Sequence, residues 1–189
     1  IGRRFLNAGL GFGGGCLPKD IRAFMARAGE LGVDQALTFL REVDAINMRR
    51  REKTVDLVRG SFGGSLLGHT VTVLGAAFKP NSDDVRDSPA LSIAGSLSLA
   101  GASVIVYDPQ AMENAKKNFP TLEYAPSIEA ALEGSEMVVV ATEWQQFRDI
   151  DPVAAKKLVK RAAVLDGRNC LPADQWRAAG WDVTCLGRG

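Results

Sequence analysis

The sequence has only one histidine, His69, and three cysteines among its 189 residues. A single histidine excludes His-rich metal clusters, and the three cysteines form no C-x-x-C pair, so we expect no metal site. An odd number of widely spaced cysteines also argues against a disulfide framework and favours reduced thiols. We therefore predict a cytoplasmic protein, in which each thiol must be considered alone.

The sequence also lacks an excess of charge and a long apolar run. Lys and Arg total 23 against 22 Asp and Glu, so neither nucleic acid nor a membrane surface is an expected partner. No apolar stretch approaches the ~20 residues that span a bilayer, and no signal segment opens the chain. Because 46% of the residues are apolar, the sequence predicts a soluble globular protein with a sizeable core.

The first third of the chain has helical periodicity. Apolar residues recur at helical spacing from Pro18 to about Arg59, with a break at 29–32, and the simplest prediction is one long helix, best defined over about 34–59. Its polar middle, NMRRREK (47–53), cannot be buried on every side. The apolar stripe therefore packs either against the following domain or against a second copy of the chain.

Beyond this segment the pattern becomes that of an α/β domain. Residues 70–78, TVTVLGAAF, are typical of a strand buried on both faces of a parallel sheet, and Pro89 then opens a helix with Ser88 as its cap. Strand and helix patterns alternate to the end of the chain. We predict an α/β fold in which a long central helix is followed by a Rossmann-like, doubly wound parallel sheet. The expected domains are residues 1–60 (cysteine loop and central helix), 61–69 (linker) and 70–189 (sheet domain).

Ligands of such domains lie at the carboxyl ends of the strands. The predicted strand ends place residues 76–86, Asp108, 142–144 and 166–169 along one rim. Residues 74–80, LGAAFKP, lack the glycines of a phosphate loop. We therefore expect a Rossmann-like domain without the usual NAD site.

Five glycines precede Cys16 in the stretch GLGFGGGCLPKD (9–20). Gly9, Gly11 and Gly14 satisfy G-x-G-x-x-G, but no buried strand precedes them, which argues against a dinucleotide loop. Glycines instead allow the backbone to approach a bulky ligand closely. The alternative is a flexible linker followed by a small buried cysteine.

Cys16 lies just before a helix expected to begin at Pro18. The helix dipole and Lys19 both favour a thiolate at this position, and Asp20 can orient a water molecule or accept a proton. These features are typical of a nucleophilic cysteine. Cys170 and Cys185 lack such surroundings, and we expect them to be structural.

Several longer motifs resemble those of one enzyme family. GFGGGCLPKD, LGAAFKPNSDDVRDSPAL, VYDPQAMENA, ATEWQQF and LDGRN are similar to motifs of the UDP-glucose 6-dehydrogenase family, and the likeness runs from Ile1 to Gly187. The resemblance implies the central and C-terminal part of an NAD-dependent enzyme that oxidises UDP-glucose to UDP-glucuronate, with the NAD-binding Rossmann domain outside this chain. It also implies a homodimer formed through the central helix. We expect this chain alone not to oxidise UDP-glucose.

The resemblance also implies roles for particular residues. Cys16 is implied as the nucleophile that forms a thiohemiacetal and then a thioester, and Asp20 as the acidic residue that assists hydrolysis. Phe78 is implied to contact uracil and Lys79 phosphate. The full implied set comprises Asn7, Gly9, Gly11, Phe12, Gly13, Phe78, Lys79 and Arg168 for the substrate, and Lys19 and Arg86 for NAD.

Some features leave alternatives open. Gly15 stands where the family usually has serine, so a hydroxyl near the thiol is missing. The cysteine motif is shared with dehydrogenases of GDP-mannose and of UDP-N-acetyl sugars, and a non-catalytic nucleotide-binding module is a further alternative. The pair Asp83 and Asp84 is interpreted as a helix cap or an ion pair with Arg86 rather than a metal site. Trp144 and Trp176 are interpreted as packing residues.

Overall fold

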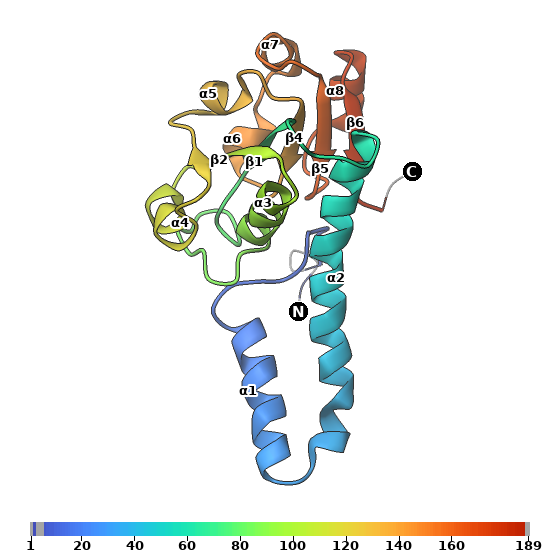
Figure 1. Cartoon of the computed structure of the whole chain (residues 1–189), viewed down its shortest axis with the longest axis vertical. Helices are drawn as coiled ribbons and strands as arrows, with labels where there is room; N and C mark the ends of the chain where they lie inside the picture. The colour runs from blue at the N-terminus through green and yellow to red at the C-terminus, as the bar shows by residue number, and fades with distance from the viewer. Residues whose placement is uncertain (1, 3–5, 188–189) are drawn as a thin grey trace.

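A helical hairpin leads into a sheet-containing unit in the computed structural model, which describes residues 2 and 6–187 (Figure 1). The hairpin consists of α1 (Leu17–Glu30) and α2 (Thr38–Ser61), joined through the short 3-10 helix η2 (Asp34–Leu37). The two helices run side by side in opposite directions, and α2 continues until it packs against the sheet unit.

The long helix predicted over about 34–59 is confirmed as α2, but it does not extend back to Pro18 as one helix, because the chain reverses direction after α1. Gly32 has a φ of +69°, and its N–H donates to the Gly29 carbonyl at 3.0 Å. The Val33 N–H donates to the Ala28 carbonyl at 2.9 Å. These two bonds form a Schellman motif, which satisfies the last carbonyls of a helix and ends it. The reversal brings the start of α1 beside the middle of α2.

The sheet unit contains six parallel strands in the order β3-β2-β1-β4-β5-β6. In this doubly wound order the chain runs from the centre to one edge, returns to the centre and runs to the other edge. The predicted fold class is therefore confirmed. The strands are β1 (Thr70–Leu74), β2 (Ser103–Tyr107), β3 (Glu123–Tyr124), β4 (Met137–Val140), β5 (Ala163–Asp166) and β6 (Asp182–Cys185).

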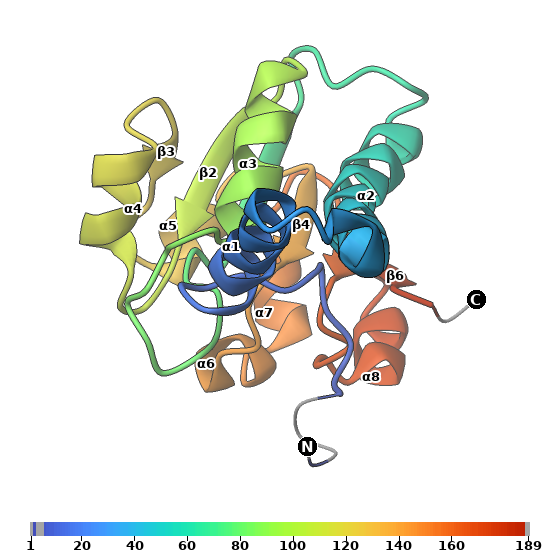
Figure 2. The same ribbon diagram turned by 90° about the horizontal axis from the view of Figure 1, so that it is seen from below.

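Helices connect these strands and cover both faces of the sheet. The Ser88 hydroxyl accepts the Leu91 N–H at the start of α3 (Pro89–Leu99), which confirms the predicted cap. Figure 2 shows α2 and α3 on one side of the sheet and α6, α7 and α8 on the other. The remaining helices are α4 (Met112–Asn118), α5 (Ile128–Leu132), α6 (Gln145–Arg148), which the periodicity did not predict, α7 (Pro152–Lys156) and α8 (Ala173–Ala178).

The apolar core lies in the sheet unit and includes the C-terminal half of α2. Strands β4 and β5 are buried along their whole length, as expected for strands covered on both faces. Val55 and Val58 of α2 belong to the same apolar cluster. Phe39 and Ile46, nearer the start of α2, are 60% and 51% exposed. The apolar stripe of α2 is therefore covered by the sheet unit only in its C-terminal half.

The segment between α2 and β1, where a linker is expected, packs against its neighbours. Leu66 is buried in the core, and the rings of Phe62 and His69 stack with their centroids 4.2 Å apart. The Arg161 guanidinium lies over the Phe62 ring and donates to the Ser61 carbonyl. These contacts hold the end of α2 against the amino-terminal edge of the sheet.

Candidate active site

The carboxyl ends of the central strands form one rim, as the sequence predicts. Asp108, just after β2, is buried and organises this rim with both carboxylate oxygens. Its Oδ2 accepts the N–H groups of Ala76 and Ala77 and the indole N–H of Trp144, at 2.8, 3.0 and 3.1 Å. Its Oδ1 accepts two further backbone N–H groups, from residues 110 and 111. Trp144 is itself buried, so its packing role is confirmed.

The same bonds bear on whether this rim can hold NAD. In a dinucleotide site, an acidic residue at this strand end binds the ribose and the loop after β1 faces the pyrophosphate. Here Asp108 is occupied by protein donors, and two of those donors are the N–H groups that follow β1. Gly75 offers no space either, because a Cβ there would lie 2.5 Å from the Thr142 hydroxyl oxygen. The strand ends of this sheet therefore do not fit NAD.

The glycine-rich segment 7–15, which we call the cysteine loop, lies across this rim. Within the described residues 6–15 it forms neither helix nor strand. Leu10 anchors it, since its side chain is 1% exposed and packs against Gly167 after β5. The loop is therefore fixed at the carboxyl edge of the sheet.

Each of the five loop glycines lies against a different part of the protein. A Cβ at Gly9 would lie 2.5 Å from an Arg168 guanidinium nitrogen, and one at Gly14 would lie 2.8 Å from the Phe78 ring. Such distances do not occur for real Cβ atoms, so glycine is required wherever the partner cannot move. The five partners are Arg168 for Gly9, Asn47 for Gly11, Asp87 and Pro89 for Gly13, Phe78 for Gly14, and Arg86 for Gly15.

Cys16 lies at the N-cap position of α1, with its side chain exposed. Its carbonyl accepts the Asp20 N–H at 2.8 Å, and Pro18 occupies the first turn, as predicted. The positive end of the helix dipole is therefore next to the sulfur. Lys19 and Asp20 are 71% and 66% exposed and form an ion pair with each other at 3.1 Å.

Arg86 lies against the loop at Gly15, directly before the cysteine. Asp84 holds its guanidinium with both carboxylate oxygens, and the Nη2–Oδ2 distance is 2.7 Å. These hydrogen bonds lower the pKa of the Asp84 carboxyl and raise the pKa of Arg86. The expected ion pair is therefore confirmed. The Gly14 N–H also donates to the Arg86 carbonyl at 2.9 Å, which joins the two segments through the backbone.

Phe78 and Lys79 follow β1 at the same rim. The Phe78 ring is half-buried against Gly14, and the Lys79 ammonium lies 5.4 Å from the centroid of that ring. Lys79 is exposed and its ammonium is available to an anion. An aromatic face with a cation beside it suits a base and its phosphates.

Arg168 lines a cavity of about 470 Å³ together with the first residues of the cysteine loop. Glu143, after β4, holds its guanidinium at 2.6 and 2.7 Å, and both side chains are only 16% exposed. Glu143 lies within the predicted rim segment 142–144 but was not among the predicted site residues, although its position at a strand end was the available signal. The cavity is lined by Leu6, Asn7, Ala8, Glu143, Arg148, Arg168, Asn169 and Cys170.

The other two cysteines differ from Cys16 in their surroundings. Burial and the nearby Asp166 carboxylate raise the pKa of the Cys170 thiol to about 12. Cys185 is buried at the end of β6. The surroundings of Cys170 therefore favour the neutral thiol, and the burial of Cys185 fits its predicted structural role.

The structure thus brings some predicted site residues together and leaves others apart. Phe78, Arg86 and Arg168 all contact glycines of the cysteine loop. Lys19 and Asp20 lie on the exposed side of α1 and pair with each other. Among the described residues, no group of three His, Cys, Asp or Glu side chains is arranged to hold a metal ion.

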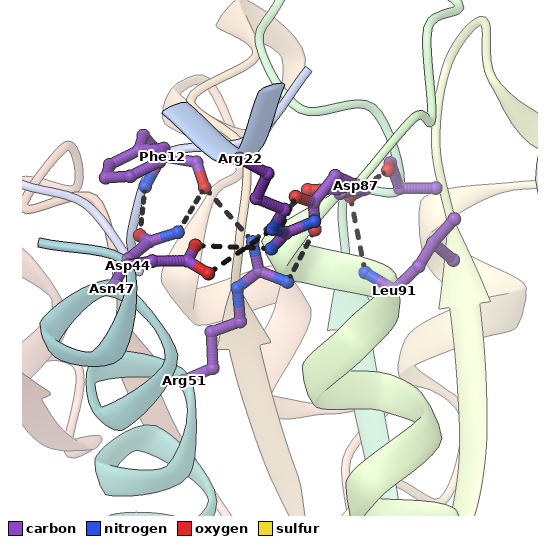
Figure 3. A network of polar contacts seen from close by, with 9 residues as sticks. Phe12, Arg22, Asp44, Asn47, Arg51, Asp87 and Leu91 are labelled. Atoms are coloured by element: carbon purple, nitrogen blue, oxygen red, sulfur yellow. Dashed lines mark hydrogen bonds and ion pairs between the residues drawn. The ribbon is translucent and has the colours of Figure 1, made fainter. Parts of the chain in front are cut away.

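Helix α2 contributes residues that sequence reasoning did not single out. Asn47 and Arg51 are 3% and 5% exposed, and both bond to the backbone of Phe12 in the cysteine loop (Figure 3). They lie in the stretch 47–53, whose polarity indicates a solvent-facing surface. Their four-residue spacing, which puts them on one face of α2, was the signal that could have found them.

Comparison with known proteins identifies the class to which this fold and rim belong. Residues 72–173 match the UDP binding domain of the UDP-glucose/GDP-mannose dehydrogenase family, and residues 1–49 match its central domain. The chain therefore belongs to the UDP-glucose/GDP-mannose dehydrogenase family.

Particular members of the family resemble the whole chain. It is 37% identical over 189 residues to UDP-glucose 6-dehydrogenase YwqF of Bacillus subtilis (strain 168), covering 100% of this chain and 42% of that protein. It is 38% identical to a UDP-glucose 6-dehydrogenase of Rhizobium meliloti (strain 1021), covering 100% of this chain and 43% of the relative. The chain thus spans well under half the length of these relatives.

Solved structures agree with the sequence comparison. A UDP-glucose dehydrogenase from Pyrobaculum islandicum superposes with a TM-score of 0.81 at 36% identity, over 99% of this chain and 40% of that chain. A GDP-mannose dehydrogenase from Pseudomonas aeruginosa gives a TM-score of 0.73 at 25% identity, over 90% of this chain and 39% of that chain. Among the described helices, none combines the length and apolar character that crossing a membrane requires.

Proposed function

We propose that this chain carries the nucleophile and the nucleotide-sugar cradle of an NAD-dependent UDP-glucose 6-dehydrogenase, which oxidises UDP-glucose to UDP-glucuronate. The main support is the path of the cysteine loop. Its glycines lie against Phe78, Arg86 and Arg168, so that one aromatic ring and two guanidinium groups share a rim with the loop that leads to Cys16. An accessible cysteine at a helix start favours this proposal over a non-catalytic nucleotide-binding module.

Sequence similarity favours UDP-glucose over the alternative substrates. The relatives named as UDP-glucose 6-dehydrogenases are 37% and 38% identical to this chain. The solved GDP-mannose dehydrogenase and a UDP-D-ManNAc dehydrogenase from Pyrococcus horikoshii are 25% and 26% identical. We therefore assign Phe78 to uracil, Lys79 to the phosphates, and Arg168 with the loop residues Asn7 to Gly13 to the rest of the UDP-sugar.

Cys16 performs covalent catalysis in this proposal. NAD, when bound, supplies the hydride acceptor for both oxidations at C6. Once C6 is an aldehyde, the Cys16 thiolate adds to its carbonyl carbon, and the thiohemiacetal is oxidised to a thioester with loss of a hydride and a proton. Water then attacks the thioester carbonyl, the sulfur leaves as a thiolate, and UDP-glucuronate is released. The dipole of α1 stabilises that thiolate, and Asp20 orients the water.

Lys19 and Arg86 are the residues that we assign to NAD. Lys19 follows Cys16 in the first turn of α1, and Arg86 contacts the loop at Gly15, directly before the cysteine. Both side chains are exposed cations, and cations suit the negative charge of a pyrophosphate. The strand ends of this sheet do not fit the dinucleotide, so its main binding domain must lie outside them. We expect a cytoplasmic setting, because the mechanism requires a reduced thiol.

The proposal is tested first by titration calorimetry of the chain with nucleotide sugars. We expect UDP-glucose to bind about tenfold more tightly than ADP-glucose, which differs in the base, and than GDP-mannose. Phe78→Ala should remove the preference for the uracil base. Equal affinity for UDP-glucose and ADP-glucose would contradict the uracil assignment. With UDP-glucose and NAD both added, the chain should form no NADH, because the strand ends of its sheet do not fit NAD.

A second test follows the thiols. We expect iodoacetamide to modify Cys16 first in the folded chain, because it is exposed at a helix start, while the raised pKa of Cys170 keeps that thiol neutral. Peptide mapping by mass spectrometry measures this order, and unfolded chain is the control. Faster reaction of Cys170 or Cys185, or full activity of Cys16→Ala in the whole enzyme, would show that Cys16 is not the nucleophile.

We also propose that the chain forms a homodimer through the hairpin. Large apolar side chains gather on it without cover from the sheet unit, and such exposure in a helix pair favours association. Those more than one third exposed are Leu17, Phe24, Leu31, Val33, Phe39, Ile46 and Met48.

A further inference from the structure

The middle of α2 holds the backbone of the cysteine loop with two buried polar side chains (Figure 3). The Asn47 side chain pairs with both main-chain groups of Phe12. Its Oδ1 accepts the Phe12 N–H at 2.7 Å, and its Nδ2 donates to the Phe12 carbonyl at 3.0 Å. A side-chain amide that matches a peptide group in this way fixes both the position and the orientation of that peptide.

Arg51, one turn further along α2, connects the loop to the start of α3. Its Nη2 donates to the Phe12 carbonyl at 3.1 Å, and its Nη1 donates to the Asp87 carboxylate at 2.9 Å. Arg22 of α1 lies 3.7 Å from the other Asp87 oxygen and also pairs with Asp44 of α2. We call the group Asn47, Arg51 and Asp87 the loop clamp.

The glycines beside Phe12 allow the clamp to come this close. Gly11 has a φ of +121°, and a Cβ there would lie 2.5 Å from the Asn47 Oδ1 atom. A Cβ at Gly13 would overlap the Asp87 carbonyl oxygen. The glycines on either side of Phe12 therefore leave room for the side chains and backbone of the clamp, in addition to any room that they leave for a ligand.

We propose that Asn47 and Arg51 are positioning residues, which hold the cysteine loop in its binding conformation and so set the affinity for the sugar part of the nucleotide sugar. This inference rests on the proposed function. A segment with five glycines has a large conformational entropy when it is free, and ordering it at the moment of binding would weaken affinity. The clamp orders the loop before the ligand arrives. Phe78 and Lys79 belong to the sheet unit, so binding of the UDP part depends less on the clamp.

The inference is tested with three variants of the chain. Asn47→Leu has a similar size and loses both bonds to Phe12. Asn47→Asp keeps the acceptor for the Phe12 N–H and loses the donor. Thr54→Ala is the matched control, because Thr54 is also a buried polar residue of α2, but its hydroxyl bonds to the Arg50 carbonyl of its own helix.

Two readouts separate positioning from general stability. Hydrogen exchange of the Phe12 amide should become about tenfold faster in Asn47→Leu, while the Gly75 amide, bonded to the Tyr107 carbonyl at 2.7 Å, keeps its rate. Affinity for UDP-glucose should fall about tenfold, and affinity for UDP less than about threefold. Asn47→Asp should give intermediate values for both, and Thr54→Ala should change neither relative to wild type.

Three results would overturn the positioning role, the proposed function or the clamp itself. Equal weakening of UDP and UDP-glucose in Asn47→Leu, or the same pattern in Thr54→Ala, would overturn the positioning role. If wild type does not prefer UDP-glucose to ADP-glucose, the proposed function fails, and the loop clamp is then judged on hydrogen exchange alone. Unchanged exchange of the Phe12 amide in Asn47→Leu would overturn the clamp itself.

Discussion

The helical hairpin and the sheet unit are stabilised in different ways. Most of the buried apolar residues belong to the sheet unit, where strands such as β4 are buried at every position. In the hairpin, α1 buries only Pro18 and Ala28, and the first half of α2 contributes the buried polar Asn47. The sheet unit therefore has an apolar core of its own. The stability of the hairpin depends instead on polar contacts and, in the proposed dimer, on the second copy that covers its exposed apolar face. Substitutions matched between the two regions make this difference measurable.

The largest difference should come from shortening one leucine in each region. Leu165 of β5 is 1% exposed, and Leu165→Ala should lower the free energy of unfolding by about 2–5 kcal/mol, because it leaves a cavity. Leu31, at the end of α1, is 60% exposed, and Leu31→Ala should change it by less than about 0.5 kcal/mol. Urea unfolding at low protein concentration measures both values. Similar losses would mean that the hairpin has a core of its own.

A smaller difference is expected from removing one carboxylate in each region. Asp108→Ala leaves several buried donors without an acceptor, and should cost on the order of 3 kcal/mol. Asp44 of α2 pairs with the half-exposed Arg22, so Asp44→Ala should cost less than about 1 kcal/mol. Thermal unfolding followed by circular dichroism gives the two values. A larger effect at Asp44 would reverse the comparison.

Self-association distinguishes the two regions in another way. Phe39→Glu or Ile46→Glu places a charge on the exposed apolar face of α2, and each should weaken dimerisation about tenfold or more. Leu99→Glu, on a sheet-unit position that is 92% exposed, serves as the control and should have no effect. Sedimentation equilibrium measures the dissociation constant. If wild type is monomeric throughout, the proposed dimer is wrong.

The smallest effect concerns pH and the amino-terminal edge of the sheet. The Lys160 ammonium, together with the Thr70 N–H and His69, lowers the pKa of Glu136 to about 2 from its ordinary value of 4.5. A lowered folded pKa stabilises the protein fully above pH 4.5, and this contribution is lost as the pH falls from 4.5 towards 2.

Glu136→Gln should therefore lower stability by about 1 kcal/mol at pH 7 and have little effect near pH 2. In the hairpin, Glu30 and Arg27 are each about two thirds exposed, so Glu30→Gln should change stability by less than about 0.5 kcal/mol at any pH. Denaturant titrations between pH 2 and pH 7 provide the measurement. A pH-independent effect of Glu136→Gln would mean that its carboxylate form is not what stabilises the sheet edge.

Sequence patterns predicted the sheet unit well and the hairpin less well. Alternating strand and helix periods gave each strand of the sheet, and the Ser88-Pro89 pair gave the start of α3, because these are local signals. The reversal after α1 was missed. A glycine within a helical pattern indicates a break, but the direction of the chain after it depends on the φ of Gly32 and on packing between α1 and α2.

The site shows the same limit. The accessible cysteine at the start of a helix followed from the local sequence around Pro18. The partners of the loop glycines did not, because Asn47 and Arg168 are far from them in sequence and the pattern carries no record of those contacts. The polarity of residues 47–53 argued only against burial on every side and did not single out Asn47 and Arg51, whose burial depends on hydrogen-bond partners far away in the sequence.

The Schellman reversal also has a consequence for the order of folding. Phe12 and Asn47 are separated by 35 residues, and closing a flexible loop of that length costs conformational entropy. The two antiparallel helices shorten the effective length of that loop, and the contacts between them are local in sequence. The parallel sheet requires pairing between distant strands and forms slowly by comparison. Once the hairpin has formed, the contact between Phe12 and Asn47 therefore closes a shorter effective loop and costs less conformational entropy.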